Sequence, residues 1–403
     1  MDRVKLFFEC LNRPVVFSSA ECTQGSVFFA LPGAKVHGHQ YLKQAKELGA
    51  EIAVIEESYN GDTYGLDCVR VEKTLDTLQA IAAQVVREFK FHIVGITGSC
   101  GKTTTKDFTT SMLRHKYDVE KSPGTRNSQV GLPTAIINMR KDAELYVFEM
   151  GMSMPGELTK LVQIAPPEVA AITMIARAHL EFFGSTEAIA KAKGEIFSSE
   201  LLKKGFVGEG ASMFPFLTNG HEIVKHAHFP EHDDLPEHFH DDASIALAIA
   251  EYYGVDRQSA LSSLEKPSDA RRFNLKEIDG VFWLSDSYNC IPEALAAALK
   301  NLPQKGERNV ALLSEMKELG EQAAAIHEEL AQEAAAHLDL LVCYGEHMKK
   351  FETAFLRDGK EVLWFPTREE AADALQRVVR SGDLVLVKGA NSQKLWELIP
   401  CYS

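Results

Sequence analysis

The sequence predicts an α/β protein of three units: a small N-terminal α/β unit, a central unit around a parallel sheet, and a C-terminal Rossmann-like unit. Three observations carry this prediction. Continuous apolar runs such as residues 91–97 (FHIVGIT) are typical of strands buried on both faces. A loop of small residues around Lys102 follows that run and opens a helix. Over the last third of the chain, strand patterns alternate with helix patterns, which is typical of a Rossmann-like sheet.

In the N-terminal unit, residues 1–89, two strand patterns flank a helix that ends near Gly49. The strand patterns are residues 25–31 (GSVFFAL) and 51–57 (EIAVIEE). We therefore expect a small α/β unit at this end of the chain.

The central unit, residues 90–267, has more buried strands. After the strand at 91–97 we expect a helix at 104–117, strands at 145–150 and 169–174, and a helix at 241–254 that stops at Gly254. Residues 220–242 are rich in His and Asp, a composition found in metal-binding tracts. Their spacings match no zinc template, and we expect a solvated loop there.

The C-terminal unit, residues 268–403, shows a regular alternation. A helix pattern occupies residues 368–380 (REEAADALQRVVR). The strand patterns are residues 309–316, 338–345, 361–365 and 383–389.

Composition narrows the class of protein. The 403 residues are 45% hydrophobic and 25% charged, which is ordinary for a globular protein of two or three domains. The 43 basic and 57 acidic residues leave a net charge of -14, which disfavours nucleic acid or an anionic membrane as the main partner. No apolar run approaches the roughly 20 residues of a membrane span, and the opening residues lack a signal-peptide pattern, so we expect a cytoplasmic protein. The seven cysteines include no CxxC pair, so neither a disulfide framework nor a zinc site is expected.

The loop after the strand at 91–97 is suited to phosphate, although it is not a Walker loop. A Walker loop would place its first glycine at position 96, where this chain has Ile96. Backbone N–H groups and the positive end of a helix still attract an anion at such a turn. Lys102 can reach the outer phosphates of a nucleotide, and the Thr103 hydroxyl can ligate Mg²⁺. We expect a nucleoside triphosphate site, rather than a plain strand-to-helix turn, made by Gly98, Ser99, Cys100, Gly101, Lys102, Thr103 and Thr104.

The TGxxGKTT pattern at residues 97–104 resembles the corresponding loop of the Mur ligase family. The resemblance covers nearly the whole chain and implies the family's three-domain architecture. DSYN, together with FALPGAKVHGHQYL in the N-terminal unit, is similar to the members that join D-alanyl-D-alanine to UDP-N-acetylmuramoyl-tripeptide. The other segments follow in family order: EMGMSMPGEL (149–158), AHLEFFGSTEAIAKAKGEIF (178–197), DSYN (286–289), EMKELGEQAAAIH (315–327) and VKGANS (387–392).

This resemblance implies ATP-dependent peptide-bond formation in the synthesis of peptidoglycan precursors. In the family, the γ-phosphoryl group of ATP converts the substrate carboxylate to an acyl phosphate, which an amine then attacks. We expect a monomer. Two alternatives stay open, namely a sister amide ligase of the Mur or folylpolyglutamate type, and a degenerate ATP-binding scaffold that has lost ligation. Intact Lys102, Glu149, His179 and Lys193 argue against the scaffold.

The resemblance also assigns catalytic and metal-binding residues. Lys102 would neutralise phosphate charge, and Thr103 and Glu149 would hold Mg²⁺ between the β- and γ-phosphates. His179 and Lys193 would serve a second Mg²⁺. Because an ammonium group has no acceptor for a metal, the resemblance implies that Lys193 is carbamylated by CO₂. The surrounding AKAKGEIF segment favours Lys193 over Lys191 for this role.

Nucleotide and substrate contacts follow from the same resemblance. Those near the nucleotide are His238, Asp242, Arg272, Asp286, Tyr288 and Asn289. His240 is an alternative to His238 for the same family position. Those near the substrate are Ser18, Ser19, Asn127 and Lys388.

The chain departs from the family at several of these places. Ala20 stands where an arginine is expected near the uridine nucleotide, and Asp242 and Ile291 each replace an asparagine. The segment between Phe197 and His238 is also far shorter than is usual in the family. We therefore expect a central sheet that has lost strands.

Overall fold

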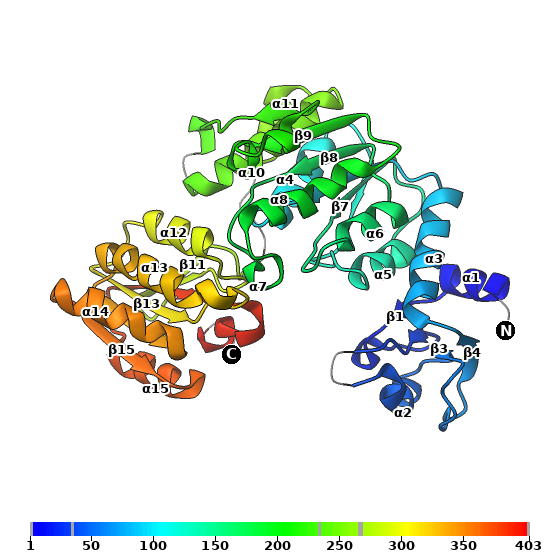
Figure 1. Ribbon diagram of the computed structural model, residues 1–403, viewed down its shortest axis with the longest axis horizontal. Coiled ribbons are helices and arrows are strands. Elements are labelled where there is room, and N and C mark those ends of the chain that lie inside the picture. The colour runs from blue at the N-terminus through cyan, green and yellow to red at the C-terminus, as the bar shows by residue number, and fades with distance from the viewer. Residues whose placement is uncertain (1–2, 34–35, 233–234, 265–268, 401–403) are drawn as a thin grey trace.

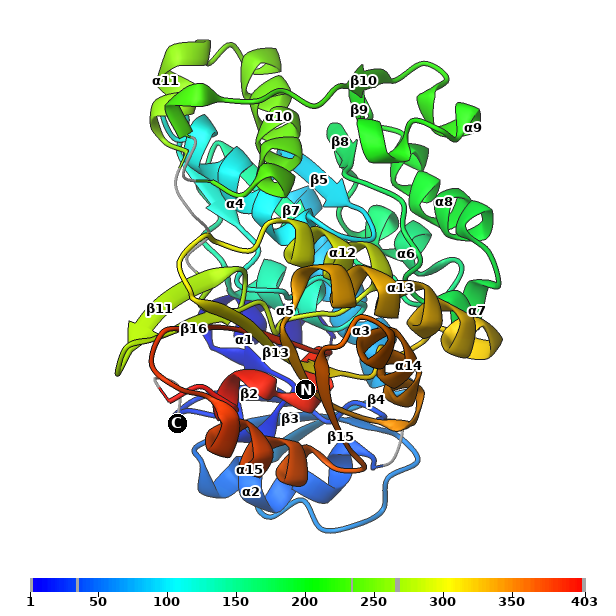
Figure 2. The same cartoon turned by 90° about the vertical axis from the view of Figure 1, so that its left-hand side faces the viewer.

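A computed structural model describes residues 3–33, 36–232, 235–264 and 269–400. It contains three sheets, and the unit around the central sheet lies between the other two (Figure 1). After a quarter turn, the C-terminal unit lies in front of the N-terminal unit, and both are below the central one (Figure 2). The predicted boundary between residues 267 and 268 falls outside the described residues. Among the helices that the structure describes, none is both long and apolar enough to cross a bilayer.

The N-terminal sheet has four parallel strands in the order β1-β2-β3-β4. The strands predicted at 25–31 and 51–57 are β2 and β3, and the predicted helix ends just before Gly49, whose φ of +103° favours glycine. The elements are α1 (Arg3–Asn12), β1 (Val15–Val16), β2 (Val27–Phe29), α2 (Leu42–Glu47), β3 (Ile52–Glu56), β4 (Asp67–Val71) and α3 (Thr74–Glu88).

Helix α3 joins the N-terminal unit to the central unit and packs against both. Leu78, Ile81 and Val85 repeat at helical spacing and are buried. They belong to the same apolar core as Leu132 and Ile136 of α5 (Gly131–Asn138). This shared core holds the N-terminal sheet against the central unit.

The central sheet has six parallel strands in the order β10-β9-β8-β5-β7-β6. The strands predicted at 91–97, 145–150 and 169–174 are β5, β7 and β8, and the predicted phosphate loop leads into α4. The strands are β5 (Ile93–Thr97), β6 (Val119–Lys121), β7 (Leu145–Glu149), β8 (Val169–Ile172), β9 (Lys204–Gly208) and β10 (Glu222–Val224). The helices besides α5 are α4 (Lys102–Leu113), α6 (Glu157–Ile164), α7 (Leu180–Phe183), α8 (Thr186–Gly194), α9 (Pro215–Thr218), α10 (Glu237–Tyr252) and α11 (Arg257–Ser262).

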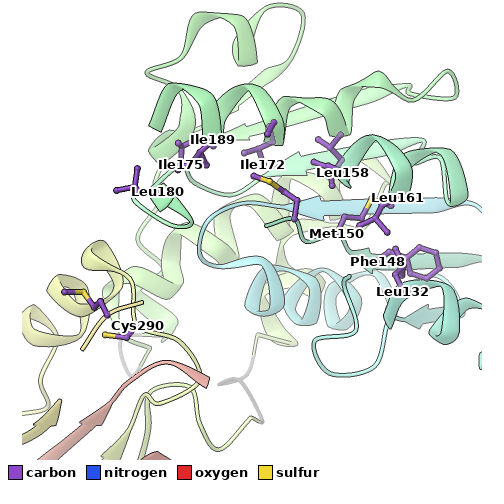
Figure 3. Packing of buried hydrophobic residues seen from close by; sticks show 14 of the residues in the cluster. Leu132, Phe148, Met150, Leu158, Leu161, Ile172, Ile175, Leu180, Ile189 and Cys290 are labelled. Carbon is purple, nitrogen blue, oxygen red and sulfur yellow. The ribbon is translucent and has the colours of Figure 1, made fainter. Parts of the chain in front are cut away.

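Apolar side chains attach helices to one face of the central sheet. Figure 3 shows Met150, at the end of β7, facing Leu158 and Leu161 of α6, while Ile172 of β8 lies toward Ile189 of α8. Burying each such side chain contributes about 1.5–3 kcal/mol. The opposite face is covered by α4 and α10, which form a second core.

The expectation of a solvated loop over residues 220–242 is wrong in part. Strand β10 lies within this segment, and α10 begins at Glu237 instead of residue 241. Leu235 and Phe239 are 5% and 6% exposed and belong to the core between α10 and α4. These apolar side chains, and not the more numerous charged ones, determine the structure here.

The C-terminal sheet has the order β11-β12-β16-β13-β14-β15, in which β11 alone is antiparallel to its neighbour. The four predicted strands are β13 to β16, and the predicted helix is α15. The hairpin β11–β12 was missed, although Asp279 and Gly280, with φ of 52° and 75°, form the usual Asp-Gly hairpin turn. The elements are β11 (Asn274–Ile278), β12 (Val281–Ser285), α12 (Pro292–Lys300), β13 (Arg308–Ser314), α13 (Ala323–His337), β14 (Leu340–Tyr344), α14 (Lys350–Arg357), β15 (Glu361–Phe365), α15 (Arg368–Val378) and β16 (Asp383–Lys388).

Candidate active site

The predicted phosphate loop lies at the carboxyl end of β5, where the strand order of the central sheet changes direction. Ligands of open α/β sheets bind outside this edge. Gly98 and Gly101 have φ of +154° and +83°. A Cβ atom would lie 1.8 Å from Thr173 Oγ1 at the first position and 2.1 Å from Asp242 Oδ1 at the second. Glycine is therefore favoured at both places, because the φ angles are positive and the loop packs closely against these two side chains.

Side chains of the loop divide into anchors and cavity-lining groups. Ser99 is an anchor, because its Oγ donates to Ala176 O at 3.3 Å and accepts from Ala176 N at 3.0 Å. Lys102 begins α4, and its Nζ donates a 2.8 Å hydrogen bond to Gly98 O. A bound phosphate can take the place of that carbonyl as the partner of Lys102.

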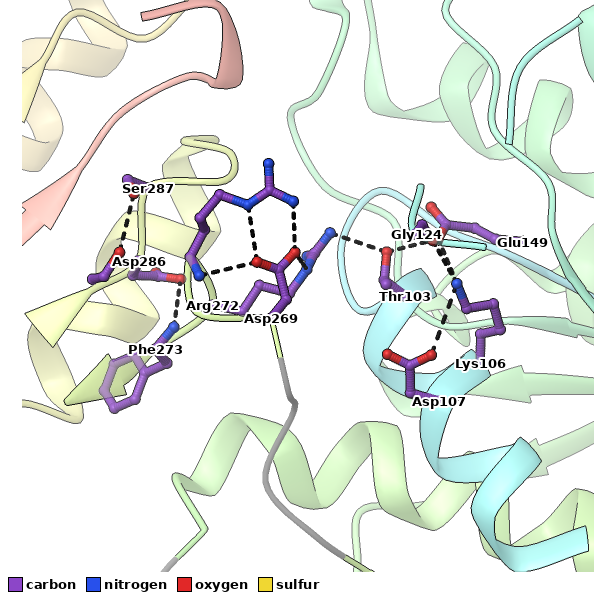
Figure 4. A network of polar contacts seen from close by, with 12 residues as sticks. Thr103, Lys106, Asp107, Gly124, Glu149, Asp269, Arg272, Phe273, Asp286 and Ser287 are labelled. Atoms are coloured by element: carbon purple, nitrogen blue, oxygen red, sulfur yellow. Dashed lines mark hydrogen bonds and ion pairs between the residues drawn. The ribbon is translucent and has the colours of Figure 1, made fainter. Parts of the chain in front are cut away.

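A chain of hydrogen bonds joins the loop to the end of β7 (Figure 4). Thr103 Oγ1 donates a 2.6 Å hydrogen bond to Glu149 Oε2. Asn127 Nδ2 donates a 2.5 Å bond to Glu149 Oε1. Arg272 Nη2, from the C-terminal unit, donates a 3.0 Å bond to Thr103 Oγ1. Hydroxyl and carboxylate oxygens are the ligands that Mg²⁺ prefers, so this pair of residues fits the predicted ion.

Lys193 and Lys191 lie in different environments on α8. Lys193 is 1% exposed, whereas Lys191 is on the surface and pairs with Glu187 at 2.8 Å. Burial, followed by the charge of Lys102, holds the pKa of the Lys193 ammonium well below its usual value. A neutral amine is the form that combines with CO₂. The surroundings therefore favour Lys193 for this reaction, while carbamylation itself stays a prediction.

His179 is held by a residue of the C-terminal unit. It precedes α7 with φ of 60° and ψ of 26°, and its Nδ1 is hydrogen-bonded to Glu318 Oε2. A carboxylate on one imidazole nitrogen orients the other nitrogen for a metal. Glu318 was not among the predicted site residues, although it lies in the segment 315–327 that resembles the family.

Two cavities meet at the phosphate loop. The acyl cavity, of about 330 Å³, is lined by the predicted phosphate residues except Gly98 and Thr104 and by the predicted metal residues except Lys193. The nucleotide cavity, of about 230 Å³, is lined by Thr104 and by the predicted nucleotide residues. Lys193 lines neither cavity. The acyl cavity is lined by Ser99, Cys100, Gly101, Lys102, Thr103, Asn127, Glu149, His179, Arg272, Tyr288 and Asn289, among others. The nucleotide cavity is lined by Cys100, Gly101, Thr104, His238, Asp242, Arg272, Asp286, Tyr288, Asn289 and Lys388, among others.

Of the two predicted alternatives, His238 lines the nucleotide cavity and His240 does not. His240 is fully buried, and its Nδ1 accepts a 3.1 Å hydrogen bond from Phe229 N. Burial lowers the pKa of His238 to about 4. Asp242 accepts a 3.0 Å hydrogen bond from Thr105 Oγ1, and burial raises its pKa well above the usual value. Asp242 is therefore bonded to the first turn of α4, just after the phosphate loop, and it also lines the nucleotide cavity.

The 286–289 segment borders both cavities and is anchored by Lys388. Lys388 Nζ is buried and donates to Asp286 Oδ2 at 2.5 Å and to Asn289 O at 3.0 Å. The Arg272 guanidinium lies 3.9 Å from the centroid of the Tyr288 ring. Lys388 was expected to contact the substrate. The structure places its Nζ against this segment and its side chain at the wall of the nucleotide cavity, and the substrate contact stays a prediction.

The predicted uridine contacts lie apart from both cavities. Ser19 is 8% exposed, and its hydroxyl donates a 2.7 Å hydrogen bond to Gln44 Oε1. Ser18 precedes the same turn without capping it, and Ala20 is exposed. The structure therefore does not bring Ser18 and Ser19 together with the phosphate loop.

Three side chains of the His-rich segment come close together. The possible ligand atoms of His228, Glu237 and His240 lie within 4.8 Å of one another. The His228 and His240 rings, however, are stacked at 22° with centroids 4.8 Å apart. Imidazole binds a metal in the plane of its ring, so two stacked rings cannot share one ion in this arrangement. In this arrangement the cluster is not suited to hold a metal ion.

Three family models match successive parts of the chain. The model described as "Mur ligase family, catalytic domain" matches residues 15–86. "Mur ligase middle domain" matches residues 96–208, and "Mur ligase, glutamate ligase domain" matches residues 271–391. Each match falls on one of the three sheets.

Full-length relatives agree with these matches. The UDP-N-acetylmuramoyl-tripeptide--D-alanyl-D-alanine ligase of Treponema pallidum is 30% identical over 96% of this chain and 93% of its own length. The Bacillus subtilis protein of the same name is 28% identical over 96% of this chain and 92% of its own. The crystal structure of MurF ligase from Thermotoga maritima in complex with ADP is 29% identical and covers 98% of this chain and 97% of its own, with a TM-score of 0.78. With a 30% identical relative matched over nearly its whole length and three family models in order, this chain belongs to the Mur ligase family.

Proposed function

We propose that this protein is an ATP-dependent ligase that joins D-alanyl-D-alanine to UDP-N-acetylmuramoyl-tripeptide in the synthesis of peptidoglycan precursors. One observation carries the proposal: the Lys102 ammonium and the hydrogen-bonded pair Thr103 and Glu149 line one cavity, which Arg272 reaches from the C-terminal unit. Such a site can bring a nucleotide phosphate and a second anion together. The similarity of the whole chain to ligases named for this reaction supports the choice of substrates.

The proposed reaction has two steps, because a carboxylate must be activated before an amine can displace one of its oxygens. In the first step, a carboxylate oxygen of the tripeptide attacks the γ-phosphorus of ATP, the bond to ADP breaks, and an acyl phosphate forms. In the second, the amine of D-alanyl-D-alanine attacks the carbonyl carbon, phosphate leaves with the bonding electrons, and the nitrogen loses a proton. Both steps bring anions together, so the site requires cations and hydrogen-bond donors.

The side chains divide this task between them. Lys102 and the N–H groups of the loop hold the outer phosphates, and Arg272 reaches the same place from the other side of the cavity. Tyr288 lies against the Arg272 guanidinium and limits its movement. The protein therefore contributes mainly positioning and charge.

We propose Mg²⁺ as the cation, with Thr103 and Glu149 holding one ion and His179 and Lys193 a second. When bound, Mg²⁺ neutralises charge on phosphoryl oxygens. The chain's own residues orient the ligands, since Asn127 holds Glu149 and Glu318 holds His179. Lys193 would act as a carbamate, formed when its neutral amine adds to CO₂ and releases a proton. Its burial and lowered pKa support this.

We also propose three domains, residues 1–89, 90–267 and 268–403, because each range contains one sheet. We propose that the protein acts as a monomer. We also propose a cytoplasmic location, as the family resemblance implies.

A coupled assay of ADP release tests the proposed function. With UDP-N-acetylmuramoyl-tripeptide and ATP, we expect release that depends on added D-alanyl-D-alanine. A sister ligase would release ADP only with a different amino-acid acceptor. A degenerate scaffold would bind ADP but turn over with none of them, and either result would exclude our assignment.

A further inference from the structure

Lys106 is a buried lysine that the proposed reaction does not use. It lies on α4, on the same side as Lys102, and is 1% exposed. Burial lowers the pKa of its ammonium, while the carboxylates of Glu149 and Asp107 act in the opposite direction. Burying an ammonium is costly unless its donors are bonded, so a lysine at this position needs a physical reason.

Lys106 contacts the turn at residues 122–124, which lies beside Glu149. Nζ donates to Gly124 O at 2.5 Å, as Figure 4 shows. It also donates to Ser122 O at 3.0 Å. It also lies 4.0 Å from Glu149 Oε2. Ser122 contacts Glu149 as well, because its Oγ accepts a 3.1 Å hydrogen bond from Glu149 N.

The turn that Lys106 holds leads directly to Asn127. The Asn127 amide donates to Glu149 Oε1 at 2.5 Å. On its other side the amide lies against Gly151, where an added Cβ would be 2.8 Å from Asn127 Cγ. The turn lies between β6 and α5, and backbone bonds hold its two ends, since Ser122 N donates to Val147 O at 3.1 Å and Asn127 O accepts from Gly151 N at 2.8 Å. Between these ends, Gly124 O accepts its bond from Lys106.

We propose that Lys106 is a positioning residue, which holds the turn at residues 122–124 and thereby sets Asn127 and the Glu149 carboxylate for the nucleotide-bound divalent cation. This inference rests on the proposed function, in which Glu149 is a cation ligand. Two effects of Lys106 have opposite signs. Its charge repels a cation, so loss of charge alone would tighten cation binding. Loss of the hydrogen bonds that hold the turn would weaken it, and the sign of the change separates the two effects.

Binding of Mn²⁺ in the presence of ADP, followed by electron paramagnetic resonance, tests this without turnover. Lys106→Met removes the ammonium and keeps most of the side-chain volume. We expect the Kd for Mn²⁺ to rise about tenfold, while the affinity for ADP in EDTA changes less than twofold. In turnover assays the change should fall mainly on the KM for Mg²⁺.

Lys141→Met is the matched control. Lys141 Nζ also donates to two backbone carbonyls, those of Ile137 and Met139. It precedes β7, at the amino end of the strand whose carboxyl end carries Glu149. This variant should lower the melting temperature and leave Mn²⁺ affinity as in the wild type.

Asn127→Leu removes the hydrogen bond between Asn127 and Glu149 and leaves Lys106 in place. This variant tests the proposal if Lys106→Met does not fold. We again expect Mn²⁺ binding weaker by about tenfold, and the double variant should be at most threefold weaker than the weaker single one. The proposal is overturned if Lys106→Met binds Mn²⁺ as tightly as the wild type or more tightly. If Lys106→Met does not fold, the same result in Asn127→Leu overturns it. So does an equal loss in Lys141→Met. Failure of the proposed function looks different, because Glu149→Gln would then bind Mn²⁺ and ADP as well as the wild type does.

Discussion

Lys102, at the start of α4, lines the acyl cavity, whereas Lys193, in the last turn of α8, is buried and lines neither cavity. The two amines are nevertheless close enough for the charge of Lys102 to be the second cause, after burial, of the lowered pKa of Lys193. Lys102 lines the cavity in which phosphate would bind, and burial shifts Lys193 toward its neutral form. We therefore expect different results from replacing Lys193 and from replacing Lys102.

Lys193→Ala should be nearly inactive. Loss of the proposed carbamate removes several kcal/mol of electrostatic stabilisation, and at about 1.4 kcal/mol per tenfold the rate of ADP release should fall at least a hundredfold. Bicarbonate or small carboxylates at high concentration should restore part of it. Lys191→Ala is the control and should keep most activity, because Lys191 is on the surface and pairs with Glu187. More than about a tenth of the wild-type rate in Lys193→Ala, or loss of activity in Lys191→Ala, would contradict the assignment.

Lys102→Ala should abolish ligation and leave the fold intact. Its Nζ makes one short hydrogen bond, to the carbonyl of Gly98 in its own loop, so little packing depends on it. Without it, the charge on the phosphates is not neutralised, and we expect the rate to fall at least a hundredfold. Circular dichroism and the melting temperature should match the wild type. Near-normal turnover would rule out the ATP site at this loop.

Ala20→Arg should strengthen binding of the uridine nucleotide. Ala20 is exposed, so an arginine fits without repacking. A charge-assisted contact with the substrate contributes roughly 1.5 to 3 kcal/mol, and less at a solvated site. We expect the Michaelis constant for UDP-N-acetylmuramoyl-tripeptide to fall several-fold at unchanged kcat. Arg126 from the central unit already pairs with the neighbouring Glu21 at 3.0 Å and has to share that space. An unchanged or higher constant counts against a uridine site at this turn.

Stability should depend on His238 at mildly acidic pH. Its pKa is about 4 in the folded protein, below the usual 6.5, so the unfolded chain binds more protons between these values. The contribution of His238 therefore becomes more unfavourable as the pH falls from about 6.5 to about 4, on the order of 2 kcal/mol at pH 5.

His238→Gln removes this titration. Between pH 7.5 and pH 5, its melting temperature should rise relative to the wild type by roughly 2–3 °C, which is about 2 kcal/mol divided by the unfolding entropy of the whole chain. His92→Gln is the control, because the His92 side chain is 58% exposed. A constant difference between His238→Gln and the wild type would show that the ring is solvated.

Features of local origin could be predicted from the sequence. The strand at 91–97, the glycine turn and the following helix lie within one continuous stretch, so a local pattern predicts all three. The strands β13 to β16 were found for the same reason, since each is a short apolar run between turn residues. The hairpin β11–β12 was also within reach, because Asp279-Gly280 is a local signal. The order of the segments that resemble the Mur ligases led from there to the family, and the comparisons confirm it.

Contacts between distant parts of the chain were decided only by the tertiary structure. β5 lies between β7 and β8, so the loop after β5 meets Glu149 at the end of one neighbour and Thr173 just after the other. No local pattern contains that strand order. The roles of Lys106 and Glu318 depend on it and on the docking of the C-terminal unit, because the partner of a buried or half-buried polar group is set by what packs beside it. The sequence by itself thus determined the phosphate loop and the family, whereas packing decided which side chains hold the predicted ligands in place.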